Sequence, residues 1–350
     1  MGQHFAHLVE ESRRNGRLAC YYTPAGKDGD PKACPTHSTW ARWLMRFTPL
    51  RVFPDWTAYV NAEFYDRAVA AALQAPTDCF MGFAGEVLHS FRRARALGTE
   101  QLELVSATSH VDNVARRHEE AVQDSGFGRS WLNDRLKAKV LREYELADRI
   151  YVHSEYTRQS FLAAGIPSSK LVRTHLQPDA RFVPPTTRLS DGIFRVVYVG
   201  RVETVKGIPL LIEAFSQLDV PNAELTLVGG WSARSMRTYM ERRMACDPRI
   251  TVRPGDPLPV LHRADVFVHP TYEDGFGYAP REALACNVPV IVTEDTGMKE
   301  HIVDGENGHV IPTGDGDALL DRLEDRYRKW SAQRPPEAPR LSQPAPPTIS

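Results

Sequence analysis

Through the second half of the chain, short apolar runs alternate with stretches in which apolar residues recur at helical spacing. Phe194–Val199 is a short β-branched run that ends at Gly200, which is typical of a buried strand. Over residues 207–218 the apolar side chains recur three or four positions apart, which predicts a helix. Strands separated by helices are typical of a parallel sheet covered on both faces, so we expect a Rossmann-like α/β domain over residues 190–330. The further strands are predicted at 224–228, 250–253, 265–269, 288–292 and 309–311, and the further helices at 232–246, 258–263, 278–286, 297–303 and 315–329.

The first half shows the same two patterns less regularly, and we expect it to form a second Rossmann-like domain over residues 1–185. Prolines and polar residues at 184–190 separate the two patterns. Residues 331–350 hold six prolines and almost no apolar side chains, which predicts a disordered tail. Strands are predicted at 17–22, 78–81, 102–105 and 149–152, and helices at 57–73, 87–96, 131–147 and 155–164.

Composition excludes several classes of protein. Lys+Arg number 43 and Asp+Glu 44, for a formal net charge of −1, so a generally basic surface for nucleic acid is not expected. No apolar run approaches the roughly 18 residues of a membrane-spanning helix, and charged residues stand where a signal peptide would be apolar. The five cysteines are scattered without a C-x-x-C pair, which is typical of reduced thiols. We therefore expect a cytoplasmic protein.

The first candidate site is the passage from Gly200 and Arg201 to Lys206 and Gly207. A glycine ends the predicted strand here, and two cations flank the start of the next predicted helix. A helix N-terminus offers free N–H groups and a partial positive charge, and Arg and Lys add full charges, which together suit a diphosphate. The alternative is a solvated loop with two surface cations.

The second candidate site is the turn at residues 272–283, which follows a predicted strand. Gly275 and Gly277 allow backbone N–H groups to approach a ligand closely. Asp274 and Glu282 bracket this turn with seven residues between them. Carboxylates accept hydrogen bonds from hydroxyls, which suits a sugar ring or a ribose. An acidic turn before an ordinary helix is the alternative.

Taken together, the two sites resemble the family 4 (group 1) retaining glycosyltransferases, which have the GT-B fold of two Rossmann-like domains facing a cleft. The shared pattern is Gly-Arg-x-x-x-x-Lys-Gly followed by Asp-Gly-Phe-Gly-x-x-x-x-Glu-Ala. The resemblance is dense over residues 192–317 and weaker over 102–184, and before that it rests on the order of elements. Further matches are Leu227-Val228-Gly229, Ala264-Asp265-Val266, Pro289-Val290-Ile291, residues 304–308 and 145–150, and Ser154-Glu155-Tyr156-Thr157.

The resemblance implies a role for each matching residue of the second half. In this family the residues at Arg201 and Lys206 hold the diphosphate of a nucleotide sugar, and the carboxylate at Glu282 binds the ribose hydroxyls. The first carboxylate, near the donor sugar, falls on Asp274, where the family usually has Glu. Glu273 immediately precedes it and stays an alternative, because either side chain could serve with a different reach.

The resemblance also implies contacts around these residues. Backbone N–H groups of the turn around Phe276 would face the donor sugar and phosphate. The stretch from Arg253 to Gly255 lies where the family contacts the base, and His110 lies where the family places a histidine near the donor sugar. A structural histidine at this position is the alternative.

Two departures from the family concern the ends of the chain. The sequence begins at Met1-Gly2, inside what resembles the glycine-rich loop that follows the family's first strand, so that strand is expected to be missing. After Leu323 the family usually continues through helices that return to the first domain, whereas this chain passes into the proline-rich tail. Shortened ends would affect activity more than the fold of the second domain.

Two other functions stay open at this point. The pattern G-x-G-x-x-P at residues 275–280, with Asp295 at the spacing of a ribose-binding acid, suggests a nicotinamide dehydrogenase. Against it, a proline replaces the third glycine and the cationic site is left unexplained. The other alternative is a catalytically impaired glycosyltransferase-like protein that binds a nucleotide sugar, which Asp274 and the shortened ends motivate.

The function expected from these residues and the resemblance is transfer of a hexosyl group from a nucleotide-diphosphate sugar to an acceptor, with retention of anomeric configuration. No metal and no separate cofactor are expected, since the family needs none and the cationic site carries no D-x-D motif. The acceptor, a saccharide, a lipid-linked sugar or a small molecule, would enter from the first domain near His110. Peripheral contact with a membrane is compatible with this expectation, and a nucleic-acid partner is not expected.

Overall fold

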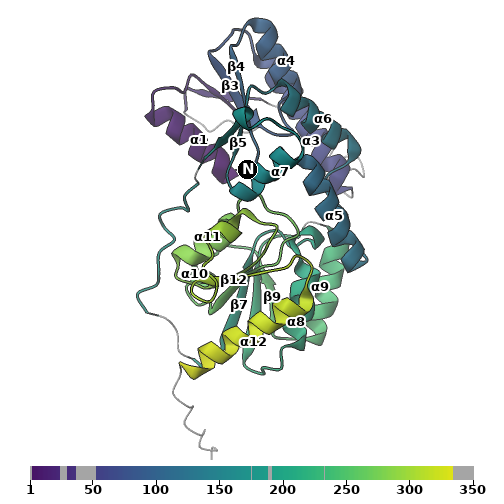
Figure 1. Cartoon of the computed structure of the whole chain (residues 1–350), viewed down its shortest axis with the longest axis vertical. Coiled ribbons are helices and arrows are strands. Elements are labelled where there is room, and N and C mark those ends of the chain that lie inside the picture. Colours follow the sequence, from purple (N-terminus) through teal and green to yellow (C-terminus); the bar gives the residue numbers. More distant parts are fainter. Residues whose placement is uncertain are drawn as a thin grey trace, which may run out of the picture.

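The protein folds as two α/β lobes, shown in Figure 1 with the first half of the chain above and the second half below. The computed structural model describes residues 2–23, 30–36, 53–174, 176–187, 191–231 and 233–333. Each lobe is built on a parallel sheet with helices packed against it. The expected α/β class with two Rossmann-like halves is confirmed. We call the upper lobe the first domain and the lower lobe the second domain.

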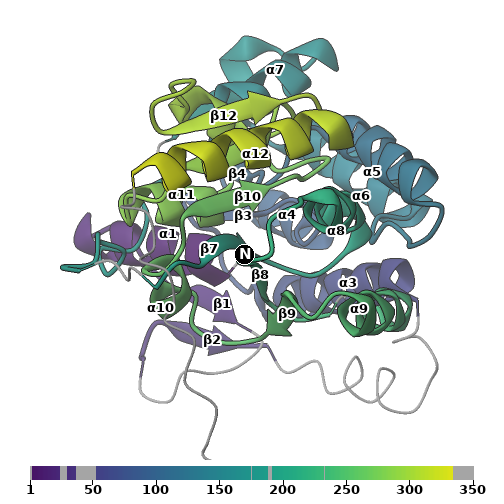
Figure 2. The same ribbon diagram turned by 90° about the horizontal axis from the view of Figure 1, so that it is seen from below.

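The second domain contains a six-stranded sheet in which every pairing is parallel. The strand order is β12-β11-β10-β7-β8-β9, and Figure 2 shows β12 toward one edge and β9 toward the other. The chain reverses its direction of travel across the sheet between β7 and β10, which is where open α/β sheets bind ligands. The strands are β7 (Phe194–Val199), β8 (Ala223–Val228), β9 (Ile250–Arg253), β10 (Val266–His269), β11 (Val290–Thr293) and β12 (Gly308–Ile311).

Helices cover both faces of this sheet and enclose two apolar cores. Figure 2 shows α8 and α9 on one side of the strands and α10 and α11 on the other. Tyr198 and Phe215 are fully buried in the first core, and Phe267 and Val290 in the second. The helices are α8 (Ile208–Gln217), α9 (Arg234–Cys246), α10 (Leu258–Leu261), α11 (Tyr278–Ala285) and α12 (Gly316–Ala332), with 3-10 turns η3 (Thr204–Lys206) and η4 (Gly297–His301).

Helix α12 closes the second domain and extends further than the sequence predicts. The rings of Tyr327 and Trp330 each lie with their centroids 5.5 Å from that of Phe194. Because this packing stabilises the last turns, the helix continues to Ala332. Residues 331 and 332, which the sequence places in the tail, therefore belong to the helix. The rest of the predicted tail, from residue 334 onward, lies outside the described residues.

The first domain holds a four-stranded parallel sheet in the order β3-β4-β5-β6. Two further short strands, β1 and β2, pair with each other in a separate parallel sheet. Among the described residues, neither of them pairs with a strand of the four-stranded sheet. The strand predicted at 17–22 is therefore shorter in the structure and begins later, as β1. The sequence did not predict β6. The strands are β1 (Tyr21–Thr23), β2 (Ala33–Pro35), β3 (Cys79–Phe83), β4 (Gln101–Val105), β5 (Arg149–Val152) and β6 (Leu171–Arg173).

The helices of the first domain include two that the sequence pattern did not reveal, α1 and α5. The buried positions of α5 are Val111, Val114, His118 and Ala121, at helical spacing, but only two of them are large and aliphatic. None of the described helices combines the length and apolar character needed to span a bilayer. The helices are α1 (Gly2–Arg14), α3 (Pro54–Ala72), α4 (Leu88–Leu97), α5 (Val111–Ser125), α6 (Asp134–Leu146) and α7 (Glu155–Ala163), with the 3-10 turn η2 (Ser168–Lys170).

Helices α5 and α7 join the two domains. In Figure 1, α7 lies between the lobes and α5 descends along one side to the lower lobe. The turn after α5 packs closely: a Cβ on Gly128 would lie 2.3 Å from Oγ1 of Thr204, and the rings of Phe127 and Tyr239 lie 4.9 Å apart. Hydrogen bonds connect the loops after β4 and β5 with the loop after β10. The carboxyl ends of the two sheets therefore face each other.

Candidate functional site

Lys206 and Asp274 meet at the carboxyl ends of β7 and β10. The Nζ of Lys206 lies 3.0 Å from Oδ2 of Asp274 and donates to the carbonyl oxygen of Glu273 at 3.1 Å. Gly207 ends the turn that carries the lysine, with φ of +69°, and a Cβ there would lie 1.8 Å from the carbonyl oxygen of Pro270. Glycine is therefore required for these two loops to approach so closely.

Asp274 lies at the centre of this contact and has four hydrogen-bond partners. Its Oδ2 also lies 3.2 Å from Nε2 of His269, and its Oδ1 accepts from the N–H groups of Phe276 at 3.3 Å and Gly277 at 2.9 Å. Burial alone would raise the pKa of Asp274, but Lys206 and His269 outweigh it and hold that pKa well below its usual range. Burial likewise opposes the charge of Lys206, yet Asp274 keeps its pKa raised. The site therefore contains a fixed ion pair.

The turn after Asp274 is oriented differently from the expectation. The resemblance places the N–H groups of Phe276 and Gly277 on the donor, whereas in this structure both donate to Asp274. Asp is one methylene shorter than Glu, so its carboxylate folds back onto N–H groups two and three residues ahead, as in Asx-turns. Gly277 is the N-cap residue of α11. Asp274 thus stands where an anion would meet the start of that helix.

Glu273 reaches in a different direction, to the first domain. It is 3% exposed, and its Oε1 accepts from the N–H of Ser109 at 2.8 Å. Ser109 lies just before α5, so this carboxylate faces the positive end of that helix. Burial nevertheless raises the pKa of Glu273 to about 7, and Lys206 opposes that shift. Of two adjacent carboxylates, one organises its own domain and the other connects the domains.

The raised pKa of Glu273 predicts a specific pH dependence of stability. Between about pH 4.5 and 7 the folded protein holds a proton at Glu273 that the unfolded chain has released, so the free energy of unfolding falls as pH rises through this window. Relative to Glu273→Gln, the wild type should lose on the order of 2–3 kcal/mol between these limits. Urea unfolding of both proteins across this range measures the difference.

Glu143 serves as an internal control for this measurement. Its pKa is also raised to about 7 by burial, but it is present in both proteins, so its contribution cancels in the comparison. Parallel stability profiles for the wild type and Glu273→Gln would contradict the assignment of the raised pKa to Glu273.

Arg201 lies on the same loop as Lys206 but turns toward solvent. Gly200, with φ of +148°, ends β7, and the Tyr198 hydroxyl donates to the carbonyl oxygen of Arg201 at 2.8 Å, which fixes the backbone. The side chain of Arg201 is 60% exposed, with Nη2 3.0 Å from Oε1 of Glu203. This guanidinium is free to move onto a ligand that binds beside Lys206. Within the described parts of the chain, no three His, Cys, Asp or Glu side chains are grouped to hold a metal ion.

The other expected donor contacts lie at the same edge of the sheet. Glu282 lies within α11 and is 5% exposed. Arg253 is the last residue of β9 and Gly255 follows it; both are exposed, and no neighbouring atom lies within 4 Å of a Cβ built on Gly255. The structure therefore leaves open space at the position where the family contacts the base.

Glu282→Ala is expected to raise the KM for the donor several-fold while changing kcat little. The resemblance implies that Glu282 binds the ribose hydroxyls of the donor, and a hydrogen bond of this kind exists both before and during the reaction, so its loss weakens ground state and transition state alike. Initial rates over a donor concentration series measure both constants, with Glu282→Gln as the variant that keeps a hydrogen-bond acceptor. A fall in kcat at constant KM would contradict this role.

His110 is buried and caps its own helix in this structure. Its ring is 4% exposed and lies between Tyr144 and Phe161, with centroids 5.0 and 5.2 Å away, and Nδ1 accepts from the N–H of Asp112 at 3.3 Å. Burial lowers the pKa of this ring, and Asp112 opposes the shift. Of the pair at 109 and 110, the residue that contacts the second domain is Ser109.

Contact between the domains also involves α5, which the sequence pattern did not reveal. Arg117 of α5 pairs at 2.5 Å with Asp295, which is 6% exposed and also accepts from Thr313. Asp295 is therefore engaged by the first domain, which argues against its use as the ribose-binding acid of a dehydrogenase. These contacts depend on α5, and the thin apolar stripe of that helix is the signal that could have found them.

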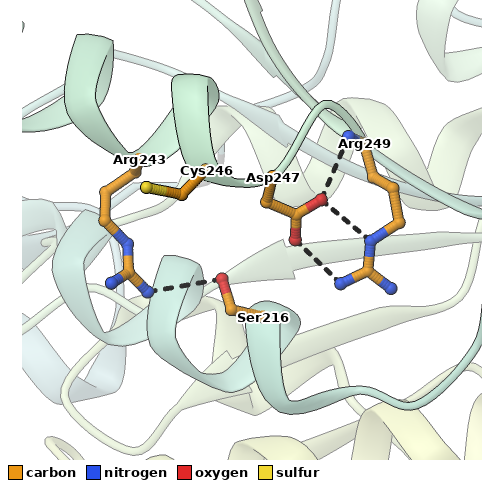
Figure 3. A pocket seen from close by; sticks show the side chains of 5 residues that line it. All are labelled: Ser216, Arg243, Cys246, Asp247 and Arg249. Atoms are coloured by element: carbon orange, nitrogen blue, oxygen red, sulfur yellow. Dashed lines mark hydrogen bonds and ion pairs between the residues drawn. The ribbon is translucent and has the colours of Figure 1, made fainter.

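One hollow lies at the opposite edge of the second sheet. Its volume is about 420 Å³, and Figure 3 shows its lining: Arg243 donates to Ser216, and Asp247 pairs with Arg249. These residues lie at the ends of α8 and α9 and just before β9, hence at the amino ends of the strands. Its charged groups are paired within the lining, so this hollow is not the candidate site. A smaller cavity of about 50 Å³ lies in the first domain beside Trp131.

Comparison with known proteins shows what the second domain is similar to. Residues 184–336 match the family model described as Glycosyl transferases group 1. This segment is similar to the group 1 glycosyltransferases. Its boundaries enclose Arg201, Lys206, Asp274 and Glu282, so the matched segment contains the candidate donor site.

Curated relatives are similar to part of this chain. The chain is 33% identical over 210 residues to the GDP-mannose-dependent alpha-(1-6)-phosphatidylinositol monomannoside mannosyltransferase of Mycolicibacterium smegmatis, covering 51% of this chain and 53% of the relative. It is 31% identical over 142 residues to the capsular polysaccharide biosynthesis glycosyltransferase CapM of Staphylococcus aureus, covering 39% and 37%. The chain thus spans about half, or less, of the length of these relatives.

Solved structures establish the fold of both domains. A sucrose-phosphate synthase of Thermosynechococcus elongatus superposes with a TM-score of 0.70 at 19% identity, covering 94% of this chain and 84% of that structure. The HepE protein of Anabaena in complex with UDP superposes with a TM-score of 0.58 at 16% identity, covering 77% and 73%. The chain has the GT-B fold, as the resemblance of the sequence implied.

Proposed function

We propose that the protein transfers a hexosyl group from a nucleotide-diphosphate sugar to an acceptor hydroxyl, with retention of anomeric configuration. The observation that carries the proposal is the Lys206–Asp274 pair, 3.0 Å apart at the switch point of the sheet, within the segment that matches the model for group 1 glycosyl transferases. Arg201 lies exposed on the same loop, and the first domain faces both. A cationic loop at this place suits a diphosphate leaving group.

The proposed chemistry uses this charge on the leaving group. As the glycosidic bond breaks, negative charge grows on the diphosphate, and Lys206 and Arg201 would stabilise it. Glu282 would bind the ribose, and the stretch from Arg253 to Gly255 would contact the base. Retention would follow from attack on the face that the diphosphate leaves, with the departing phosphate assisting the acceptor.

The acceptor would approach from the first domain. The apolar cavity beside Trp131 lies in that domain, and the loop after β4 reaches the second domain at Ser109. The mycobacterial relative acts, by its name, on a phosphatidylinositol mannoside, and the staphylococcal one in capsular polysaccharide synthesis. We therefore propose a saccharide or lipid-linked acceptor, with a small molecule as the alternative and peripheral membrane contact in the lipid case.

A donor-turnover assay tests this function. The protein is incubated with UDP-, GDP- and ADP-sugars, with and without an acceptor panel of monosaccharides and lipid-linked sugars, and release of nucleoside diphosphate is measured. We expect turnover with one nucleotide, together with an α-linked product from an α-linked donor. Binding of a nucleotide sugar without release of nucleoside diphosphate would favour the alternative of an impaired binding protein.

Transfer activity is expected to persist in excess EDTA. The positive charge needed at the diphosphate is supplied by Arg201 and Lys206, so a divalent cation is not required there. The initial rate is compared before and after EDTA treatment and after readdition of manganese or magnesium. Activity that disappears with EDTA and returns with either cation would overturn this expectation.

A further inference from the structure

The N-terminus of α7 is inserted between two loops of the second domain. A Cβ on Gly297 would lie 2.4 Å from the carbonyl oxygen of Gly275 and 2.6 Å from Cβ of Ser154, and one on Gly275 would lie 2.4 Å from the carbonyl oxygen of Ala107. Any larger residue at these glycines would push the domains apart. The backbone N–H of Glu155 also donates to Glu300 of η4. The second domain thus encloses the start of a helix that belongs to the first.

Two buried hydroxyls of this helix start converge on one carbonyl oxygen. Oγ of Ser154 lies 2.6 Å, and Oγ1 of Thr157 2.9 Å, from the carbonyl oxygen of Gly275. Both residues are at most 2% exposed, so water does not compete for these bonds. A carbonyl oxygen has two lone pairs, which these two hydroxyls match. The Gly275 peptide is therefore held from the first domain.

The same peptide group is held from the second domain on its other side. The N–H of Phe276 donates to Oδ1 of Asp274, whose Oδ2 binds Lys206. Since the peptide is planar and trans, its C=O and N–H point in opposite directions, and fixing one fixes the other. A continuous series of contacts thus runs from the hydroxyls of α7 through the Gly275 peptide to Asp274 and Lys206.

We propose that Ser154 and Thr157 are positioning residues that set the geometry of the loop at 274–277 when the two domains close. With the domains apart, Gly275 loses both hydroxyl partners and the loop is held from one side. Domain closure would then complete the site at the moment when the donor is enclosed. This inference rests on the proposed function for its catalytic consequence, and on the hydrogen bonds alone for its structural one.

Hydrogen exchange of the loop amides tests the structural part without any activity. Thr157→Val replaces a hydroxyl by a methyl group of similar size, and Thr157→Ser keeps the hydroxyl. We expect the amides of Phe276 and Gly277 to exchange about threefold to tenfold faster in Thr157→Val and faster still in Ser154→Ala/Thr157→Val. The amides of β8 serve as an internal reference and should not change. Thr157→Ser should exchange as the wild type does.

A split between binding and turnover tests the catalytic part. The nucleoside diphosphate contacts proposed for Lys206 and Glu282 lie in the second domain, so the Kd for UDP or GDP, whichever binds the wild type, should not change in Thr157→Val. Its kcat should fall about threefold to tenfold, and Thr157→Ser should recover most of that loss.

The outcomes separate this inference from the proposed function. Loop exchange unaltered in both Thr157→Val and the double variant, or Thr157→Ser behaving like Thr157→Val, would overturn the positioning role. A wild type without transfer activity, combined with the expected exchange pattern, would overturn the proposed function and leave the positioning of the loop established. Ser154 also caps α7 by accepting from the N–H of Thr157 at 3.0 Å, so its replacement can unfold the double variant. In that case the single Thr157 variants alone test the positioning role.

Discussion

Lys206→Ala is expected to lower kcat for glycosyl transfer by about 10²–10³-fold, by analogy with the loss of one oxyanion-stabilising donor. The side chain is fixed by Asp274 at 3.0 Å and by the carbonyl oxygen of Glu273 at 3.1 Å, so its ammonium group needs no rearrangement to meet the leaving diphosphate. Because the charge it stabilises develops as the bond breaks, the loss should appear in kcat more than in donor KM. Steady-state kinetics on one donor measure both.

Two further variants control this result. Lys206→Arg keeps the charge and should retain more activity than Lys206→Ala. Arg201→Ala should cost less than Lys206→Ala, since the guanidinium is 60% exposed and must first move from Glu203 onto the ligand. Near-wild-type kcat for Lys206→Ala, with the protein folded, would contradict the assignment of the diphosphate site.

The second large effect is expected at the acidic pair: Asp274→Ala should lower kcat by on the order of 10²-fold, well beyond Glu273→Ala. Asp274 has four partners, and its loss releases Lys206, His269 and the start of the turn at once. Glu273 contacts Ser109 across the domain boundary, so its loss should weaken closure without disordering the cationic site. The kinetic constants and melting temperatures of both variants on the same donor make the comparison.

Asp274→Glu and Asp274→Asn sharpen this comparison. Asp274→Glu restores the residue that the family usually has and should keep a carboxylate near Lys206, whereas Asp274→Asn keeps the shape but removes the charge. We expect the glutamate variant to retain more activity than the asparagine variant. Asp274 was chosen because seven residues separate it from Glu282. If Glu273→Ala abolishes activity and Asp274→Ala is near wild type, the site carboxylate is Glu273 and this assignment is wrong.

The second domain was predictable from sequence because its elements are short and strongly patterned. The strands at 194–199 and 250–253 were expected with the bounds that the structure has, since short runs rich in β-branched residues between turns leave little choice. The resemblance implied that Lys206 and Asp274 both lie at the donor, and the structure brings them together because loops that follow adjacent parallel strands meet at one edge of the sheet.

The interface between the domains was not predictable in the same way. Helix α5 carries few large apolar side chains, and it contacts the second domain through polar groups such as Arg117. The hydroxyls of Ser154 and Thr157 bind the carbonyl oxygen of Gly275, which lies 121 and 118 positions further along the chain. No local sequence pattern predicts such a pairing. The Asp274 carboxylate folds back onto the N–H groups of Phe276 and Gly277 because its side chain is one methylene shorter than Glu. The sequence shows the shorter side chain but not the direction in which it points.

Thermal unfolding in the presence of sugar nucleotides tests the central claim most directly, that the second domain binds a nucleotide-diphosphate sugar at Lys206. Wild type and Lys206→Ala are melted with UDP-, GDP- and ADP-sugars at equal concentrations. At about 100 times Kd a ligand adds about 2.7 kcal/mol to the free energy of unfolding, so one nucleotide should raise the wild-type melting temperature by several degrees. The same nucleotide should leave Lys206→Ala nearly unshifted. No shift with any sugar nucleotide, or equal shifts in both proteins, would contradict the account.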